Sequence, residues 1–169
     1  MTHDRLNRVR GGLGLVLLWS AGTLLVLMTL LVLYQVFTRY VLGAPAAFTE
    51  ELVRYALIWT SFLSAAYGFL YRKHMALVIV RDRFPEPVRR RLIVGIDALV
   101  LLFAVLVLVV GGAMLAYGVR NDYSALLGIS RGLVYSVAPL AGLAIAVAQG
   151  LNIWEDLAGD PSIEPEGTD

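Results

Sequence analysis

The chain has 169 residues, of which 59% are hydrophobic and 16% are charged, and its mean hydropathy is +0.74. Soluble domains average about 45–50% apolar and about 25% charged residues, so this composition excludes an ordinary water-soluble protein. The chain has no cysteine, which excludes disulfide frameworks, thiolate metal sites, iron–sulfur clusters and cysteine nucleophiles. The net charge of +1 combines a basic amino end with an acidic carboxyl end.

Four apolar segments are long enough to cross a bilayer, which requires roughly 20 residues for about 30 Å of hydrocarbon. The predicted spans are residues 11–38, 52–71, 92–119 and 132–154. The segments outside them are a basic amino end (1–10), three loops (39–51, 72–91 and 120–131) and an acidic tail expected to be disordered (155–169). The predicted fold is therefore an all-α membrane protein with four transmembrane helices and short interfacial segments.

The first apolar segment also has features of a secretory signal peptide, because it follows arginines and precedes Ala44-Pro45-Ala46. The apolar core of a signal peptide is about 7–15 residues long, and this segment is far longer. We therefore expect it to be retained as a membrane anchor.

The distribution of basic residues predicts the orientation of the chain. Ten of the 14 Lys and Arg residues lie at the amino end or in the loop 72–91, and four lie on the opposite side. Basic residues in short loops mark the cytoplasmic side of a membrane. Both termini and the middle loop are thus predicted to be cytoplasmic.

The loop 39–51 and the start of the second span gather charges at one membrane face. Thr49 is a candidate N-cap, Glu50 and Glu51 suit the positive end of the helix dipole, and Arg54 lies four residues after Glu50. One interpretation is a capped helix with a solvated ion pair, which contributes little. We favour a network in which Arg39 also pairs with the glutamates, and which fixes the hairpin or receives a partner.

The middle loop is predicted to contact lipid headgroups. Its segment 75–80 is too short to cross and is expected to lie along the interface, ended by Pro85 and Pro87. Basic and polar side chains flank this segment and can contact anionic headgroups. They are Arg72, Lys73, His74, Arg89, Arg90 and Arg91.

No cofactor, metal or nucleic-acid partner is predicted. The two histidines, His3 and His74, lie outside the spans, so they can neither build a metal site nor clamp a haem between helices. Asp97 is an intramembrane carboxylate and thus a candidate functional group, but pairing with the nearby arginines 89–91 is favoured over ion translocation. The sequence has no phosphate-binding glycine loop and no paired catalytic acids, so an enzyme is not expected.

The fourth span has two notable features. Pro139 is expected to kink its outer half. Gly142, Ala146 and Gly150 repeat every fourth residue, which would bring this helix close to a neighbour, although small residues are common in all membrane helices. Gly112 and Ala116 form a weaker pair of the same kind in the third span.

Taken in order, several motifs resemble one family, the small DctQ-type membrane subunits of tripartite ATP-independent periplasmic (TRAP) transporters. The resemblance covers nearly the whole chain. Its motifs are Arg39-Tyr40-Val41, Glu50-Glu51-x-x-Arg54-Tyr55 with Trp59, Ala65-Ala66-Tyr67 before Arg72-Lys73-His74, Asp82-Arg83-Phe84-Pro85, and Ser124-Ala125-Leu126 followed by Tyr135 and Pro139. One departure is that Ala76 and Val78 stand where the family usually has charged residues after the histidine.

The resemblance implies a bacterial inner-membrane scaffold for a large DctM-type subunit and a periplasmic DctP-type binding protein, in a sodium-coupled importer of small organic acids such as dicarboxylates or sialate. It assigns partner contacts to the outer hairpin residues, to Trp59, and to Tyr135 and Pro139. A self-contained homo-oligomeric transporter or channel is the main alternative. A haem-bearing membrane protein and a small subunit of tricarboxylate tripartite systems are the others.

Overall fold

The structure is a computed structural model that describes residues 2–44, 46–71 and 86–158. The predicted interfacial segment 75–80, with Arg72, Lys73 and His74, lies outside the described residues. The elements are α1 (Thr2–Tyr40), α2 (Ala47–Leu70), α4 (Glu86–Phe103), the π-helix η1 (Ala104–Gly111), α5 (Gly112–Gly118), α6 (Arg131–Tyr135) and α7 (Val137–Ala158).

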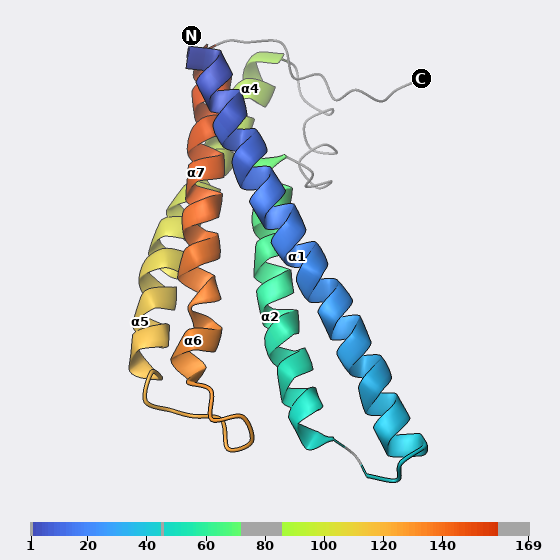
Figure 1. Cartoon of the computed structure of the whole chain (residues 1–169). Coiled ribbons are helices and arrows are strands. Elements are labelled where there is room, and N and C mark those ends of the chain that lie inside the picture. The colour runs from blue at the N-terminus through green and yellow to red at the C-terminus, as the bar shows by residue number, and fades with distance from the viewer. Residues whose placement is uncertain (1, 45, 72–85, 159–169) are drawn as a thin grey trace, which may run out of the picture.

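The helices are arranged in a row rather than in a closed bundle (Figure 1). α1 packs along α2, α2 packs on α7, and α7 packs on α4 and η1. Within the described residues the backbones of α1 and α2 do not pack closely along α4, η1 or α5. Both flanks of the row are therefore left uncovered by the described residues.

The row has two distinct ends. At one end lie the loop 41–46 between α1 and α2 and the loop 119–130 between α5 and α6, and we call it the loop end (Figure 1). At the other end lie the start of α1 and the end of α7, and we call it the terminal end. Consecutive long helices thus alternate in direction, as expected of a chain that crosses a bilayer repeatedly.

Three of the described helical segments are long and apolar enough to cross a membrane: Arg8–Tyr40, Val94–Gly118 and Arg131–Trp154. The segment expected to be the second span, α2, has 24 residues and so the required length. It is less apolar because it carries Glu50, Glu51 and Arg54 together with several hydroxyl side chains. The structure shows three membrane-capable helices, and the predicted second span, α2, stays a prediction.

The helix α7 is the centre of the row. In the 18-residue apolar stretch of its membrane-capable segment, 44% is buried inside the protein, whereas only 6% of the corresponding stretch of α1 is buried. Its core-facing residues are mostly small, and α2 and α4–η1 present small residues to them. The core cluster is Leu17, Ala66, Leu70, Ala104, Ala141, Ile145 and Ala148.

Close approach between α7 and η1 depends on Gly142. A Cβ atom on this residue would lie 2.7 Å from Leu108 Cβ and 3.0 Å from Val109 Cγ2, so a larger residue has no room. Gly150, which belongs to the same expected repeat, has no atom of the described residues within 4 Å of its Cβ position. The repeat therefore does not form one continuous packing stripe.

The fourth span is interrupted at Ser136, between α6 and α7. Pro139 explains the position, because a proline cannot donate to the carbonyl four residues earlier and its ring crowds that turn. That carbonyl belongs to Tyr135, the last residue of α6. Pro139 Cδ would in turn lie 3.0 Å from a Cβ on Gly112, so the kinked segment lies against α5.

Buried polar side chains connect three helices at the terminal end. An Arg10 guanidinium nitrogen donates to Asn152 Oδ1 at 2.6 Å, and Asn152 Nδ2 donates to the Phe69 carbonyl at 3.3 Å and to Gln149 Oε1 at 3.1 Å. Gln149 and Asn152 are almost fully buried. Beside them the Tyr71 ring packs against Gly14, where a Cβ atom would collide with it.

Two local expectations are wrong. α2 begins after Ala46, and the Thr49 hydroxyl donates back to the Ala46 carbonyl at 2.6 Å, so Thr49 is not the N-cap. α7 continues to Ala158, so the first residues of the expected disordered tail are helical. α1 begins at Thr2, so the basic amino end is helical and continuous with the first predicted span.

Gly142→Ala is expected to destabilise the protein, because the added methyl group has no room beside η1. Overpacking of this kind costs about 1–3 kcal/mol. Gly150→Ala makes the same change in the same helix at an open position, and it is expected to leave the melting temperature in detergent at or above that of the unmodified chain. Equal shifts in melting temperature for the two variants would contradict the close packing of α7 on η1.

Candidate functional site

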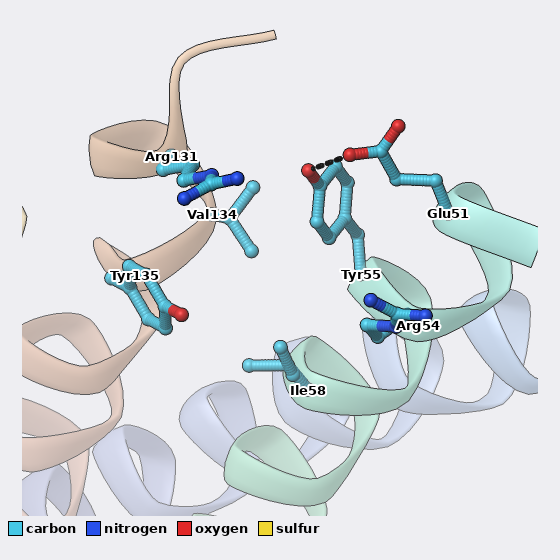
Figure 2. Close-up of a pocket in the computed structure, with 7 residues that line it drawn as sticks. All are labelled: Glu51, Arg54, Tyr55, Ile58, Arg131, Val134 and Tyr135. Atoms are coloured by element: carbon cyan, nitrogen blue, oxygen red, sulfur yellow. Dashed lines mark hydrogen bonds between the residues drawn. The ribbon is translucent and has the colours of Figure 1, made fainter. Parts of the chain in front are cut away.

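The side chain of Glu51 joins α2 to the loop 119–130 at the loop end. Its Oε2 accepts a hydrogen bond from Ser124 Oγ at 2.5 Å, and its Oε1 accepts one from Tyr55 Oη at 2.5 Å. Figure 2 shows the second of these bonds, between two residues one helical turn apart on α2. The carboxylate thus bridges its own helix and a segment more than seventy residues further along the chain.

The loop 119–130 holds Ser124 in place for this contact. The Ser124 hydroxyl accepts hydrogen bonds from the backbone N–H groups of Leu126 and Leu127, at 3.2 and 3.0 Å. Its own backbone N–H donates to the Ile129 carbonyl, and Gly128 closes the turn with a positive φ of 64°. A hydroxyl has one donor and two acceptor sites, so Ser124 uses its full capacity while nearly buried.

Trp59 provides a second connection between α2 and the interrupted fourth span. Its indole Nε1 donates to the Val134 carbonyl at 3.1 Å. Val134 is 2% exposed and lies in α6, two residues before the break at Ser136. Trp59, which was expected to contact a partner, therefore makes its polar contact within this chain.

Arg54, four residues after Glu50, forms the ion pair that the sequence suggested. The Arg54 guanidinium lies 3.4 Å from Glu50 Oε1, and both side chains are about two-thirds exposed. Such a surface pair contributes about 0.3–0.5 kcal/mol. It leaves both charged groups accessible to other molecules.

The expected pairing of Arg39 with the glutamates is wrong. Among the described residues Arg39 makes no ion pair with Glu50 or Glu51, and its guanidinium carbon lies 5.9 Å from the Tyr40 ring centre. The end of α1 and the start of α2 are splayed apart at the loop end, with the loop 41–46 between them (Figure 1). Glu51 turns instead toward Ser124.

The contacts of Glu51 favour its ionised form. The pKa of the Glu51 carboxyl is lowered from its ordinary value, first by the hydrogen bond from Ser124 and then by that from Tyr55. The positive charges of Arg54 and Arg131 lower it further, and partial desolvation acts in the opposite direction. The bridge between α2 and the loop is therefore strongest when Glu51 is charged.

A pocket of about 150 Å³ opens between α2 and α6, and we call it the polar pocket (Figure 2). Glu51, Arg54 and Tyr55 reach it from α2, while Arg131 and Tyr135 reach it from α6. The arrangement combines two guanidinium groups, one carboxylate and two phenol rings. It has the donors and acceptors of a binding site, and the described residues contain no cluster of ligands that could hold a metal ion.

The structure describes the side chains of some of the other expected site residues but not of all of them. Tyr135 lines the polar pocket, Pro139 packs near Gly112, and Ala146 is half-buried in α7. Arg89, Arg90 and Arg91 belong to α4, but their side chains lie outside the described part of the chain. Asp97, the carboxylate within the third span, is 4% exposed.

Sequence reasoning missed two sets of polar contacts. Ser124 lay within a recognised motif, but its bond to Glu51 crosses 73 positions and no local pattern indicates it. The polar cluster at the terminal end was also missed. Gln149 and Asn152, polar residues three apart within an apolar span, were the features that could have revealed it.

Glu51→Gln is expected to destabilise the detergent-purified protein at pH 7, because the uncharged amide accepts hydrogen bonds more weakly. Since the pKa of Glu51 is lowered on folding, the contribution of its charge is fully present above the unfolded value of about 4.3 and is lost as the pH falls through the folded value. The difference in melting temperature between the unmodified chain and Glu51→Gln should therefore be constant from about pH 7 to 5 and shrink below about pH 4.

Glu50→Gln is the matched control, because Glu50 pairs only within α2 in the described structure and is exposed. It is expected to change the melting temperature little at pH 7. A difference between the unmodified chain and Glu51→Gln that stays constant down to pH 3 would show that the charge of Glu51 does not hold the loop.

Comparison with known proteins gives a consistent result. The family model for the DctQ component of tripartite ATP-independent periplasmic transporters matches residues 28–159. A Haemophilus influenzae protein whose name describes it as a TRAP transporter small permease is 26% identical over 125 residues, covering 73% of this chain and 76% of that protein. The sialic acid TRAP transporter small permease protein SiaQ of Vibrio cholerae is 25% identical over 118 residues, covering 69% of this chain and 66% of that protein.

The matched region contains the last third of α1 (residues 28–40), the whole of α2, and every helix of the second half. It therefore includes Glu51, Ser124, Trp59 and the interrupted fourth span. Together with the row of membrane-capable helices, the match shows that this chain belongs to the DctQ family of small membrane subunits of TRAP transporters.

Proposed function

We propose that this chain is the scaffold subunit of a sodium-coupled importer of small organic acids in a bacterial inner membrane. The observation that carries the proposal is the open row of helices, which leaves apolar residues uncovered on α1 and on α4–η1–α5. A large membrane subunit seated on one flank would give the row a fixed neighbour, and lipid would cover the other. The substrate and sodium sites would then lie in the large subunit.

Four spans with both termini in the cytoplasm fit this role. α2 runs beside α1, and its 24 residues extend about 36 Å, enough to cross the hydrocarbon core. The contacts of Trp59 and Tyr55 satisfy polar groups that would be costly in lipid. The excess of basic residues at the amino end and in the loop 72–91 supports a cytoplasmic location for the terminal end.

The loop end would then face the periplasm and meet the substrate-binding protein. Arg39, Glu50 and Arg54 are exposed there and can contact a soluble partner. Glu51, by contrast, would fix the loop 119–130 from within. The name of SiaQ, a relative in a sialic acid system, supports a carboxylate-bearing substrate class for the complete transporter.

The absence of cysteine allows a direct topology test with single cysteines introduced into the full chain. Ala44→Cys and Ala125→Cys are expected to react in intact spheroplasts with a membrane-impermeant maleimide, and Ser162→Cys only after lysis. Labelling of Ala44 and Ser162 but not of Ala125 from outside would show three spans and overturn the placement of α2.

Partnership is tested by purifying the tagged chain with and without a co-expressed large TRAP membrane subunit. We expect a stable complex with the large subunit. A photo-cross-linking residue at Trp19 on α1, or at Met114 on α5, should capture the large subunit from at least one of these two flanks, since both side chains are more than 70% exposed. Leu126, exposed in the loop 119–130, is the control position outside the spans.

Two outcomes would contradict the scaffold role. One is a monodisperse chain that never copurifies or cross-links with a large membrane subunit. The other is substrate uptake by liposomes that contain only this chain, with uptake lost in Asp97→Asn, which would instead indicate a self-contained transporter.

A further inference from the structure

The polar pocket opens beside a long apolar groove. This groove has a volume of about 300 Å³ and lies between α1, α2 and α6. Leu24, Leu27 and Leu31 of α1 form one wall, Ala56 and Trp59 of α2 the floor, and Leu133 of α6 the other wall. Tyr55 and Val134 line both hollows, so the polar pocket and the apolar groove adjoin.

The apolar groove continues toward the middle of the membrane-capable helices. A second apolar hollow shares Leu24 and Trp59 with it and reaches Trp19 and Leu63. Along α2 the continuous lining runs from Leu52 to Leu63, which corresponds to about 17 Å of helix. Half of a hydrocarbon core of about 30 Å is close to this length, so the groove has the depth of one lipid leaflet.

The charges at the head of the groove are balanced. A further hollow beside the polar pocket adds Glu50 to Glu51, Arg54 and Arg131, so two acids and two bases surround the space. Guanidinium groups match the geometry of a phosphate, and carboxylates accept hydrogen bonds from an ammonium group. Glu51 makes two hydrogen bonds, and a carboxylate has about four acceptor positions, so it retains capacity for a further donor.

We propose that the polar pocket and the apolar groove together bind one outer-leaflet phospholipid with an ethanolamine headgroup. Arg54 and Arg131 hold its phosphate, Glu50 and Glu51 receive its ammonium group, and one acyl chain lies in the groove. The inference rests on the proposed function for the position of the loop end at the periplasmic face. A zwitterionic headgroup pairs with all four charges, whereas phosphatidylglycerol has no cation for the carboxylates.

Such a lipid would fill the wedge between the first hairpin and the second half of the chain. In Figure 1 the α1–α2 pair and the α6–α7 segment diverge toward the loop end. Among the described residues, the side-chain hydrogen bonds that cross this divergence are those of Glu51 and Trp59. The acyl chain would supply the apolar contacts that the protein does not make there.

The test uses the full chain purified in mild detergent, delipidated, and titrated with phosphatidylethanolamine, phosphatidylcholine or phosphatidylglycerol of identical acyl chains. Native mass spectrometry measures the bound lipid. One phosphatidylethanolamine is expected to bind, at least about tenfold more tightly than phosphatidylglycerol, and Arg131→Gln is expected to weaken it about tenfold through loss of a charge-assisted contact. Phosphatidylcholine, which cannot donate N–H bonds to the carboxylates, should bind less tightly than phosphatidylethanolamine.

Matched variants test the two parts of the site separately. Arg120→Gln removes an arginine that stacks on Tyr117 instead of lining the pocket, and it should leave binding unchanged. Ala56→Trp fills the groove and should abolish binding, while Leu57→Trp alters the exposed neighbouring position and should not. Arg131→Lys, which keeps the charge, should retain most of the binding and shows that the site tolerates a conservative change.

Several results would overturn the proposal. These are equal affinity for phosphatidylglycerol, equal binding of phosphoethanolamine without acyl chains, or unchanged lipid binding in both Arg131→Gln and Ala56→Trp. Repeating the measurement on the copurified complex distinguishes this inference from the scaffold role. A complex that forms but does not bind phosphatidylethanolamine refutes the lipid site alone, and a chain that binds the lipid but no large subunit refutes the scaffold role alone.

Discussion

The small residues of α7 are the constraint on which the arrangement depends. In lipid there is no hydrophobic driving force between helices, so association relies on close van der Waals packing and on polar contacts. Ala141, Gly142 and Ala148 allow α2 on one side and η1 on the other to approach the same helix. Because α7 alone joins the two halves over most of their length, the helices form a row, and the row exposes both of its flanks.

Polar contacts complement this packing at the two ends. At the terminal end Arg10 and Asn152 connect the first and last long helices, and at the loop end Glu51 reaches Ser124. Each contact joins segments far apart in the sequence and resists the splaying of helices that share little apolar contact there. In the proposed scaffold role the surface that a partner meets depends on the arrangement of the helices, and these two contacts hold that arrangement at both ends of the row.

The sequence predicted what is local and missed what is not. Runs of apolar residues predicted the helices, because a backbone in lipid has to satisfy its own hydrogen bonds. Pro139 predicted the break near Ser136, because a proline disturbs only the helical turn that precedes it. The order of the helices in the row could not be predicted, because every face of an apolar helix is compatible with lipid. The pairing of Glu51 could not be predicted either: Arg39 is near in sequence, whereas Ser124 is near only in the folded chain.

The π-helix η1 has a consequence for how the third span is compared with other sequences. Asp97 and Ala104, seven residues apart, are both buried, and on a regular α-helix the next residue in this phase would be Gly111. The buried residue is Gly112, eight positions on, which packs toward Pro139. The π-helix η1 therefore accommodates one more residue than an α-helix of the same number of turns would. As a result, α4 and α5 bury residues on the same side of the span although their spacing in the sequence is one residue longer. A homologous span that is one residue shorter at this point can present the same face to α7 as an uninterrupted α-helix.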